Sequence, residues 1–135
     1  SRCFPEAVDI MAGYRLHRGI DARDVASGHE AALIAKPRDV ATYILSAASP
    51  FLPGDVAGLK HDAPAVLRLR CPEFVALLDA RGWNVPSTID RVYDSSRAQA
   101  ELAWAPRFGF DEVLRQYDSE SADVLPPASG VTSAE

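Results

Sequence analysis

The sequence predicts an α/β protein with a small mixed sheet and several helices. Three short stretches have the composition typical of β-strands, at 15–20, 41–47 and 87–93. The first and last of them lead directly into side chains that cap helices, Asp21 and Asp94. An alternation of strand and helix signals is typical of folds in which helices cover a sheet.

The chain is organised around a strand-to-helix corner at 18–33. The capping residue Asp21 is followed three positions later by Asp24 and then by an apolar run. Such corners bring backbone N–H groups toward ligands, so this is the first place to look for a site. The two carboxylates are nevertheless expected to be helix caps, because they lie three residues apart at a helix start. We interpret His29, on the expected apolar face, as a core histidine with one backbone partner.

The stretch 41–47 is the strongest strand candidate, since its middle is β-branched and aromatic. The loop that follows contains Pro50 and Pro53, which fix its course and place Phe51 in an exposed position. An aromatic ring on a rigid loop can stack on the ring of a ligand. It can equally fill a gap in the core, and the sequence leaves both interpretations open.

Helix signals dominate the rest of the chain. Asp62 can cap a helix with Pro64 in its first turn, and Pro72 opens another that ends at 81–82. Two further helices are expected, one after Asp94 and one at 110–118. Residues 1–14 are only mildly apolar, and we expect the chain to begin mid-fold after a strand whose earlier residues are missing. Residues 1–118 then form one domain, and 119–135 form a disordered tail rich in Ser, Ala and Pro.

Composition excludes several classes of function. The 135 residues carry a net charge of −5, which argues against binding to nucleic acid or to an anionic membrane. No apolar leader or spanning segment is present, and Cys3 and Cys71 are interpreted as free thiols in a reducing cytoplasm. The three histidines lack the spacing of metal ligands, so no metal site is expected.

Motifs for nucleotide binding and proton transfer are absent. The eight glycines are too dispersed to form a glycine-rich phosphate loop. Tyr14 and Tyr93 are each followed four positions later by Arg, which stays protonated and cannot be tuned as Lys can. The chain therefore lacks the groups that would hold a dinucleotide or transfer a proton by itself.

Three ordered landmarks give the chain a family resemblance. The segment 20–33, the stretch Tyr-Ile-Leu-Ser at 43–46 and the closing segment 94–114 resemble the second half of extended short-chain dehydrogenases/reductases. This is the family of NAD-dependent epimerases and dehydratases. The resemblance covers about residues 2 to 117, and it says little about the identity of the substrate.

The resemblance implies that this is the C-terminal substrate-binding part of such an enzyme, without the Rossmann domain that carries the glycine loop and the catalytic residues. The implied substrate is a small polar carbonyl or hydroxyl compound, such as a sugar or nucleotide sugar. Cys3 and Phe4 would border NAD or NADP, held mostly by the missing domain. The chain alone is then expected to bind no cofactor and to show no turnover.

The resemblance also points to substrate-binding residues, which are Arg18, Phe51, Arg91 and Tyr93. Many nucleotide-sugar enzymes of the family have a substrate-binding Arg near the position of His17 and Arg18. Arg18 can take this role only if the alignment of the two sequences shifts by one residue. Arg91 is the nearest replacement for a second diphosphate-binding Arg, and it can instead pair with Asp90 or Asp94. A nucleotide diphosphate is therefore in doubt as the substrate.

A second hypothesis is a non-catalytic module that binds a small ligand or a protein partner. It would expose apolar surface around Val8, Ile10 and Met11 and favour a homodimer or pairing with a separate Rossmann domain. The oligomeric state discriminates between the two hypotheses.

Overall fold

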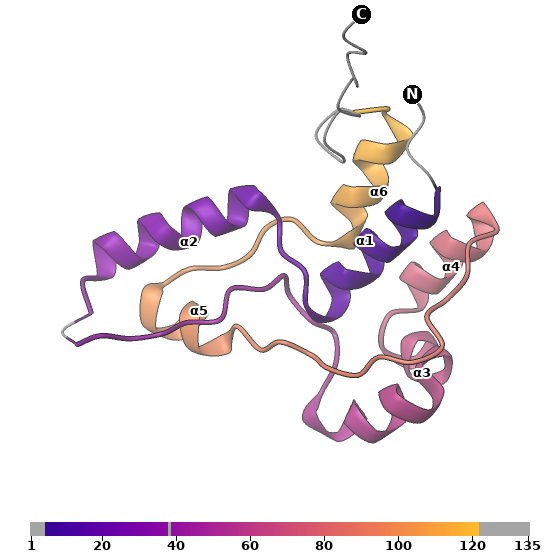
Figure 1. Ribbon diagram of the computed structural model, residues 1–135, viewed down its shortest axis with the longest axis horizontal. Helices are drawn as coiled ribbons and strands as arrows, with labels where there is room; N and C mark the ends of the chain where they lie inside the picture. Colours follow the sequence, from indigo (N-terminus) through magenta and orange to yellow (C-terminus); the bar gives the residue numbers. More distant parts are fainter. Residues whose placement is uncertain (1–4, 38, 122–135) are drawn as a thin grey trace, which may run out of the picture.

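The computed structural model describes residues 5–37 and 39–121, and the regular elements of this part of the chain are all helices, joined by extended segments (Figure 1). The elements are α1 (Pro5–His17), α2 (Ala22–Ala35), the 3-10 helix η1 (Pro53–Asp55), α3 (Val56–Arg70), α4 (Pro72–Arg81), α5 (Ser96–Leu102) and α6 (Phe110–Asp118). The predicted α/β fold with a mixed sheet is wrong, because no strand forms within the described ranges.

The first predicted strand, 15–20, begins inside a helix. Val8, Ala12 and Leu16 are all buried, and their spacing of four residues places them on one face of α1. This spacing was the signal for a helix that the strand prediction overlooked. The chain leaves α1 through a tight turn in which the Arg18 and Gly19 N–H groups both donate to the carbonyl of Tyr14.

The other two predicted strands are extended segments that do not pair into a ladder. A sheet needs a repeated series of backbone hydrogen bonds between neighbouring strands. Here the contacts are isolated, and two serine hydroxyls take part in them. They are Ala47 N–H to Gly19 O (2.8 Å), Tyr93 N–H to His17 O (2.7 Å), Ser46 Oγ to Tyr93 O (3.3 Å) and Ser95 Oγ to Ser46 O (3.3 Å).

The helices after residue 55 follow the predicted pattern. The path of α3 kinks at Asp62, whose φ is −153° and whose carboxylate accepts the Ala65 N–H at 3.3 Å. Pro72 opens α4, and Gly82 ends it with a φ of 67°. Helices α5 and α6 also lie where the sequence predicts them, and the Asp94 carboxylate accepts the Ser96 N–H at 2.8 Å.

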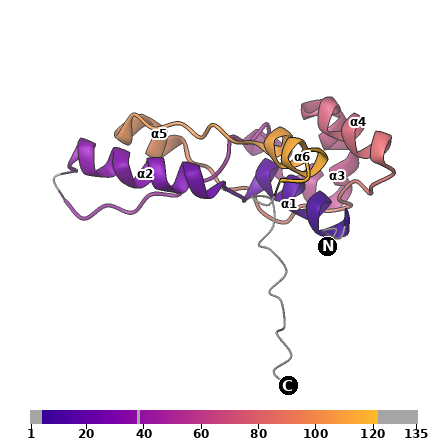
Figure 2. The same cartoon turned by 90° about the horizontal axis from the view of Figure 1, so that it is seen from above.

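Two separate cores give the molecule an elongated shape (Figures 1 and 2). In the larger part, which we call the body, α1 packs beside α6, and α3 and α4 complete the core. In the smaller part, which we call the arm, α2, α5 and the segment 40–47 pack around Trp104. The exposed apolar surface predicted around Val8, Ile10 and Met11 is found only in part. Ile10 is exposed, but Val8 is fully buried and Met11 packs on the body core.

The buried face of α2 differs from the predicted one. Asp24 and Gly28 face inward, and a Cβ at Gly28 would lie 2.6 Å from a methyl group of Leu45. His29 is exposed, with its Nδ1 2.8 Å from the carbonyl of Val25 in the preceding turn. The core interpretation of His29 is therefore wrong, although its single backbone partner is confirmed.

One backbone position is strained in a way that a substitution can relieve. Ala103 ends α5 in the left-handed region, with a φ of 50°, where a side chain is disfavoured. We expect Ala103→Gly to raise the free energy of unfolding by about 0.5–1 kcal/mol. In urea denaturation, the matched variant Ala105→Gly should instead lower it, since that residue has no positive φ. A loss of stability in Ala103→Gly would contradict this assignment of strain.

Candidate functional site

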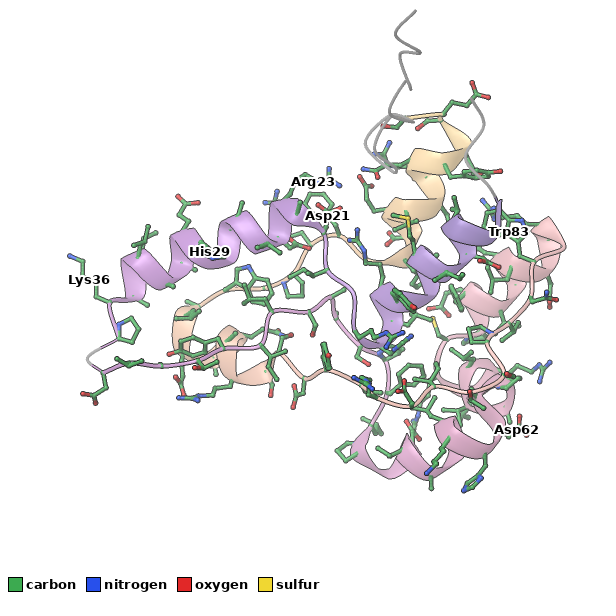
Figure 3. All side chains as sticks on the ribbon, in the orientation of Figure 1. Asp21, Arg23, His29, Lys36, Asp62 and Trp83 are labelled. Carbon is green, nitrogen blue, oxygen red and sulfur yellow. The ribbon has the colours of Figure 1, made fainter. Side chains whose placement is uncertain are left out.

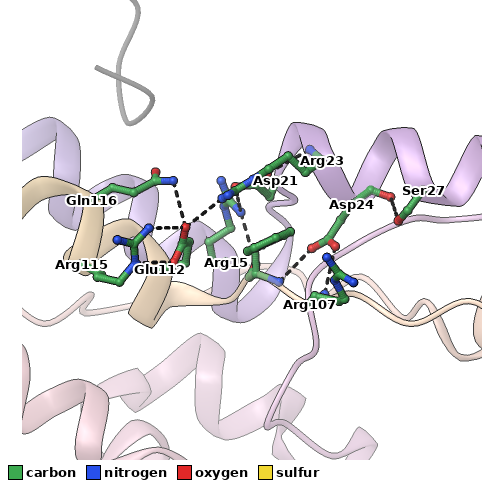
Figure 4. Close-up of polar contacts among 10 residues, drawn as sticks. Arg15, Asp21, Arg23, Asp24, Ser27, Arg107, Glu112, Arg115 and Gln116 are labelled. Carbon is green, nitrogen blue, oxygen red and sulfur yellow. Dashed lines mark hydrogen bonds and ion pairs between the residues drawn. The ribbon is translucent and has the colours of Figure 1, made fainter. Parts of the chain in front are cut away.

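The corner at the start of α2 is built of structural ion pairs (Figures 3 and 4). Asp21 caps α2 by accepting the Arg23 N–H at 2.9 Å. It also accepts two hydrogen bonds from the Arg23 guanidinium, at 2.9 and 3.1 Å, and lies 3.4 Å from Arg15. The hydrogen bonds from Arg23 lower the pKa of Asp21 to about 2, so this carboxylate is a poor proton acceptor.

The same network continues into α6 through Glu112. Arg23 donates to this carboxylate at 3.0 Å, Arg115 donates to both of its oxygens at 2.8 Å, and Gln116 donates at 3.0 Å. The hydrogen bonds from Arg115, and then from Arg23, lower the pKa of Glu112 to about 2. The network thus joins the ends of α1, α2 and α6 rather than facing a ligand.

Asp24 is the second carboxylate of the corner, and it is almost completely buried. It accepts the backbone N–H groups of Arg107 and Phe108 at 2.9 and 3.0 Å. The prediction that Asp21 and Asp24 serve structure rather than acid–base chemistry agrees with these contacts. Only Asp21 is a helix cap, however, whereas Asp24 fixes a distant segment against α2.

The two low pKa values predict how stability depends on pH. Asp21 and Glu112 are deprotonated at lower pH in the folded chain than in the unfolded one, so they stabilise the fold above about pH 4.5. This contribution is lost as the pH falls toward 2. We expect the melting temperature to fall between pH 5 and 2 more steeply in the unmodified chain than in Arg23→Gln. Parallel curves, measured by circular dichroism, would contradict this role of Arg23.

A groove on the body is the stronger candidate for a ligand site. It has a volume of about 280 Å³ and lies between the second half of α1 and the extended segment 84–90. Both elements contribute apolar and polar residues to its lining. The lining residues are Asp9, Ile10, Gly13, Tyr14, His17, Arg18, Asn84, Val85, Pro86, Thr88, Ile89 and Asp90.

His17 is the most firmly held polar side chain of this groove. It is only 7% exposed, and its Nδ1 lies 3.2 Å from the carbonyl oxygen of Arg91. The ring also meets the Tyr14 ring edge to face, with centroids 5.5 Å apart. Burial, opposed by the Arg91 carbonyl, lowers the pKa of His17 below 6.5.

Three of the four predicted substrate-binding residues surround His17. Arg18 lines the groove, and its guanidinium lies 4.2 Å from the centre of the Tyr14 ring. Arg91 forms an ion pair with Asp90 at 3.0 Å, which is the structural pairing that the sequence offered as an alternative to substrate binding. Tyr93 is 39% exposed and donates its N–H to the His17 carbonyl.

Phe51, the fourth predicted substrate-binding residue, does not line the groove. Phe51 is buried in the body core, which agrees with the packing interpretation and not with an exposed ring. Cys3 and Phe4, the predicted cofactor neighbours, fall outside the described residues. Cys71 is buried, and desolvation raises the pKa of its thiol to about 11, which suits an inert side chain.

Neither His17 nor Asp90 was predicted to be a site residue. The available signal for His17 was its place at the end of the helix whose buried face carries Val8, Ala12 and Leu16. Asp90 was considered only as an ion-pair partner of Arg91. No local pattern connects two residues so far apart in the chain, and only the fold brings them to one groove.

A second hollow, of about 680 Å³, lies on the arm between α2 and residues 103–108. Two of its polar side chains already serve the fold: Ser27 accepts the Trp104 indole N–H at 2.9 Å, and Asp24 accepts two backbone N–H groups. In the part of the chain that the structure describes, no three His, Cys, Asp or Glu side chains gather as metal ligands. None of the described helices is long and apolar enough to cross a membrane.

The chain was compared with known protein families, curated proteins and solved structures, and none of them matches it. The assignment of a function therefore depends on the groove and on the residues that line it.

Proposed function

We propose that this chain is the substrate-binding part of a cytoplasmic NAD(P)-dependent epimerase, dehydratase or reductase, and that the groove beside His17 holds its polar substrate. The observation that carries the proposal is the position of three residues around His17: Arg18 lines the groove, and Arg91 and Tyr93 contact His17 through a backbone carbonyl and a backbone N–H. The family resemblance points to the same three residues for substrate binding. A separate Rossmann domain would supply the cofactor and the groups that transfer hydride and protons.

The chemistry of the groove suits binding rather than reaction. Arg18, Asn84 and Thr88 offer hydrogen-bond donors, whereas the Asp90 carboxylate offers an acceptor. Ile10, Val85, Pro86 and Ile89 give the groove apolar surface, against which the carbon skeleton of a ligand can pack. None of the groove residues is paired as a nucleophile and its base.

The proposal is tested by titrating the 135-residue chain with methyl β-D-glucopyranoside, UDP-glucose, NAD⁺ and NADP⁺, with binding followed by NMR. We expect one of the two sugar compounds to shift groove resonances, no saturable binding of either dinucleotide, and no change in absorbance at the nicotinamide band. Arg18→Ala should weaken sugar binding about tenfold, because a charge-assisted hydrogen bond is lost. The control Arg68→Ala, on α3, should leave it unchanged.

Two results would overturn the proposal. One is hydride transfer or saturable dinucleotide binding by the chain alone, since both require groups that the sequence lacks. The other is the absence of any shift at the groove with either sugar compound.

A second candidate function is a protein-interaction module that self-associates through the arm. Leu33 and Ile34 at the end of α2 are 76% and 74% exposed, and Val40 and Ile44 on the returning segment are also exposed. Large apolar side chains gathered in this way are typical of interaction surfaces. Analytical ultracentrifugation should show a dimer that Ile34→Lys dissociates and that the control Ala26→Lys, on the same helix, does not. A monomer at all concentrations would reject this candidate.

A further inference from the structure

We propose that the groove selects an uncharged, hydroxyl-bearing ligand rather than a phosphorylated one, and that His17 accepts a hydrogen bond from a ligand hydroxyl through Nε2. The inference rests on the proposed function, since it names the substrate class of the same groove. It concerns the Nε2 atom of His17, whose protonation depends on the groups around the imidazole ring.

The first step is the tautomer of His17. The carbonyl oxygen of Arg91, 3.2 Å from Nδ1, can only accept a hydrogen bond, so Nδ1 carries the proton. In a neutral ring Nε2 is then an acceptor. It makes no hydrogen bond to the residues that the structure describes, although the side chain is more than nine-tenths buried and lines the groove. A ligand hydroxyl is the complementary group, because it can donate to this nitrogen.

The second step is the charge of the ring. Burial favours the neutral form, and the neighbouring guanidinium of Arg18 acts in the same direction. Asp90 opposes it, but Arg91 pairs with that carboxylate and lowers its pKa. From α1 itself the ring is faced by Tyr14, which contributes an edge-to-face contact and no charge. At neutral pH the groove therefore presents an acceptor at His17 and not a second cation.

The third step is the balance of charges around the ligand. Arg18 is the cation that lines the groove, and it is already stacked on Tyr14. The carboxylates of Asp9 and Asp90 line the same groove, and Arg91 is engaged with Asp90. A diphosphate would bring two negative charges into a groove whose lining offers one guanidinium, that of Arg18, to offset them. An uncharged sugar or polyol needs no such compensation and can use both the acceptors and the donors of the groove.

The experiment compares three probes on the full 135-residue chain: methyl β-D-glucopyranoside, sodium pyrophosphate and UDP-glucose. Imidazole ¹⁵N resonances report the tautomer and charge of His17 directly. We expect the glycoside to shift the His17 Nε2 resonance at pH 7.5 and to bind more tightly than pyrophosphate. Its affinity should fall about tenfold for each pH unit below the pKa of His17, because only the neutral ring accepts the hydrogen bond. His17→Gln should weaken the glycoside at least about tenfold, and the control His29→Gln should not.

The outcomes separate this inference from the proposed function. Tighter binding of pyrophosphate or UDP-glucose at the groove would overturn the inference and leave the substrate-binding role standing. Glycoside affinity that stays constant while the ¹⁵N resonances show His17 becoming protonated would also overturn it, and this measurement needs no variant that might misfold. If none of the probes shifts a groove resonance, the proposed function fails together with the inference.

Discussion

Replacing Asp24 by alanine is expected to lower the free energy of unfolding by about 3–5 kcal/mol. The carboxylate is 1% exposed and accepts the N–H groups of Arg107 and Phe108. Hydrogen bonds to a charged acceptor are worth about 1.5–3 kcal/mol each, and both N–H groups would lose their partner. Urea denaturation followed by circular dichroism measures the loss.

The conservative variant Asp24→Asn separates hydrogen bonding from volume. Asparagine keeps one acceptor oxygen but turns a donor NH₂ group toward the second N–H. We therefore expect Asp24→Asn to lower the free energy of unfolding, but by less than Asp24→Ala does. The control Glu30→Ala, on the exposed side of the same helix, should change stability by no more than about 0.5 kcal/mol. Equal stability of Asp24→Ala and Glu30→Ala would show that the buried carboxylate does not hold residues 107–108 in place.

The helices that the sequence predicts correctly are those with local signals at their ends. Pro72 and Gly82 bound α4 through backbone geometry that depends on these two residues alone. The Asp62 kink follows in the same way from a capping side chain and the nearby Pro64. Such signals act within one turn of helix, so they are legible without knowledge of the fold.

The predicted strands fail because strand composition does not by itself create a partner. The segments 41–47 and 87–93 are extended and β-branched, yet each lies beside helices and makes isolated backbone hydrogen bonds. Pairing between strands is a nonlocal property that residue composition does not encode. In addition, the strand prediction for 15–20 overlooked the four-residue spacing of Val8, Ala12 and Leu16, which indicates a helix face.

The place of the candidate site could be predicted only in part, because the position of a side chain in the fold is also a nonlocal property. Arg18, Arg91 and Tyr93 were selected from the resemblance, and they do meet around His17. The exposed position predicted for Phe51 is wrong, because the ring is buried in the body core. Whether a side chain after a rigid loop points inward depends on what packs there, which only the fold reveals.

The arm has a smaller core than the body, and this difference leads to the second large effect. Trp104 is 5% exposed and packs with Ala98 and Leu102, and its indole N–H donates to the Ser27 hydroxyl at 2.9 Å. Removing such a side chain leaves a cavity, so we expect Trp104→Ala to destabilise the arm by about 3–5 kcal/mol. Because the body has its own core, the loss should be confined to α2, α5 and the segment 40–47.

The two tryptophans of the chain report on the two parts separately, since Trp83 packs on the body core beside Tyr117. In Trp83→Phe the remaining fluorescence follows the arm, and in Trp104→Phe it follows the body. We expect the arm to unfold at a lower urea concentration than the body. In Trp104→Ala, amide exchange should accelerate in α2 while α1 and α6 keep their protection. Equal acceleration in all three helices would mean that the two cores unfold as one cooperative unit, and that the ion pairs of Asp21, Arg23 and Glu112 couple them.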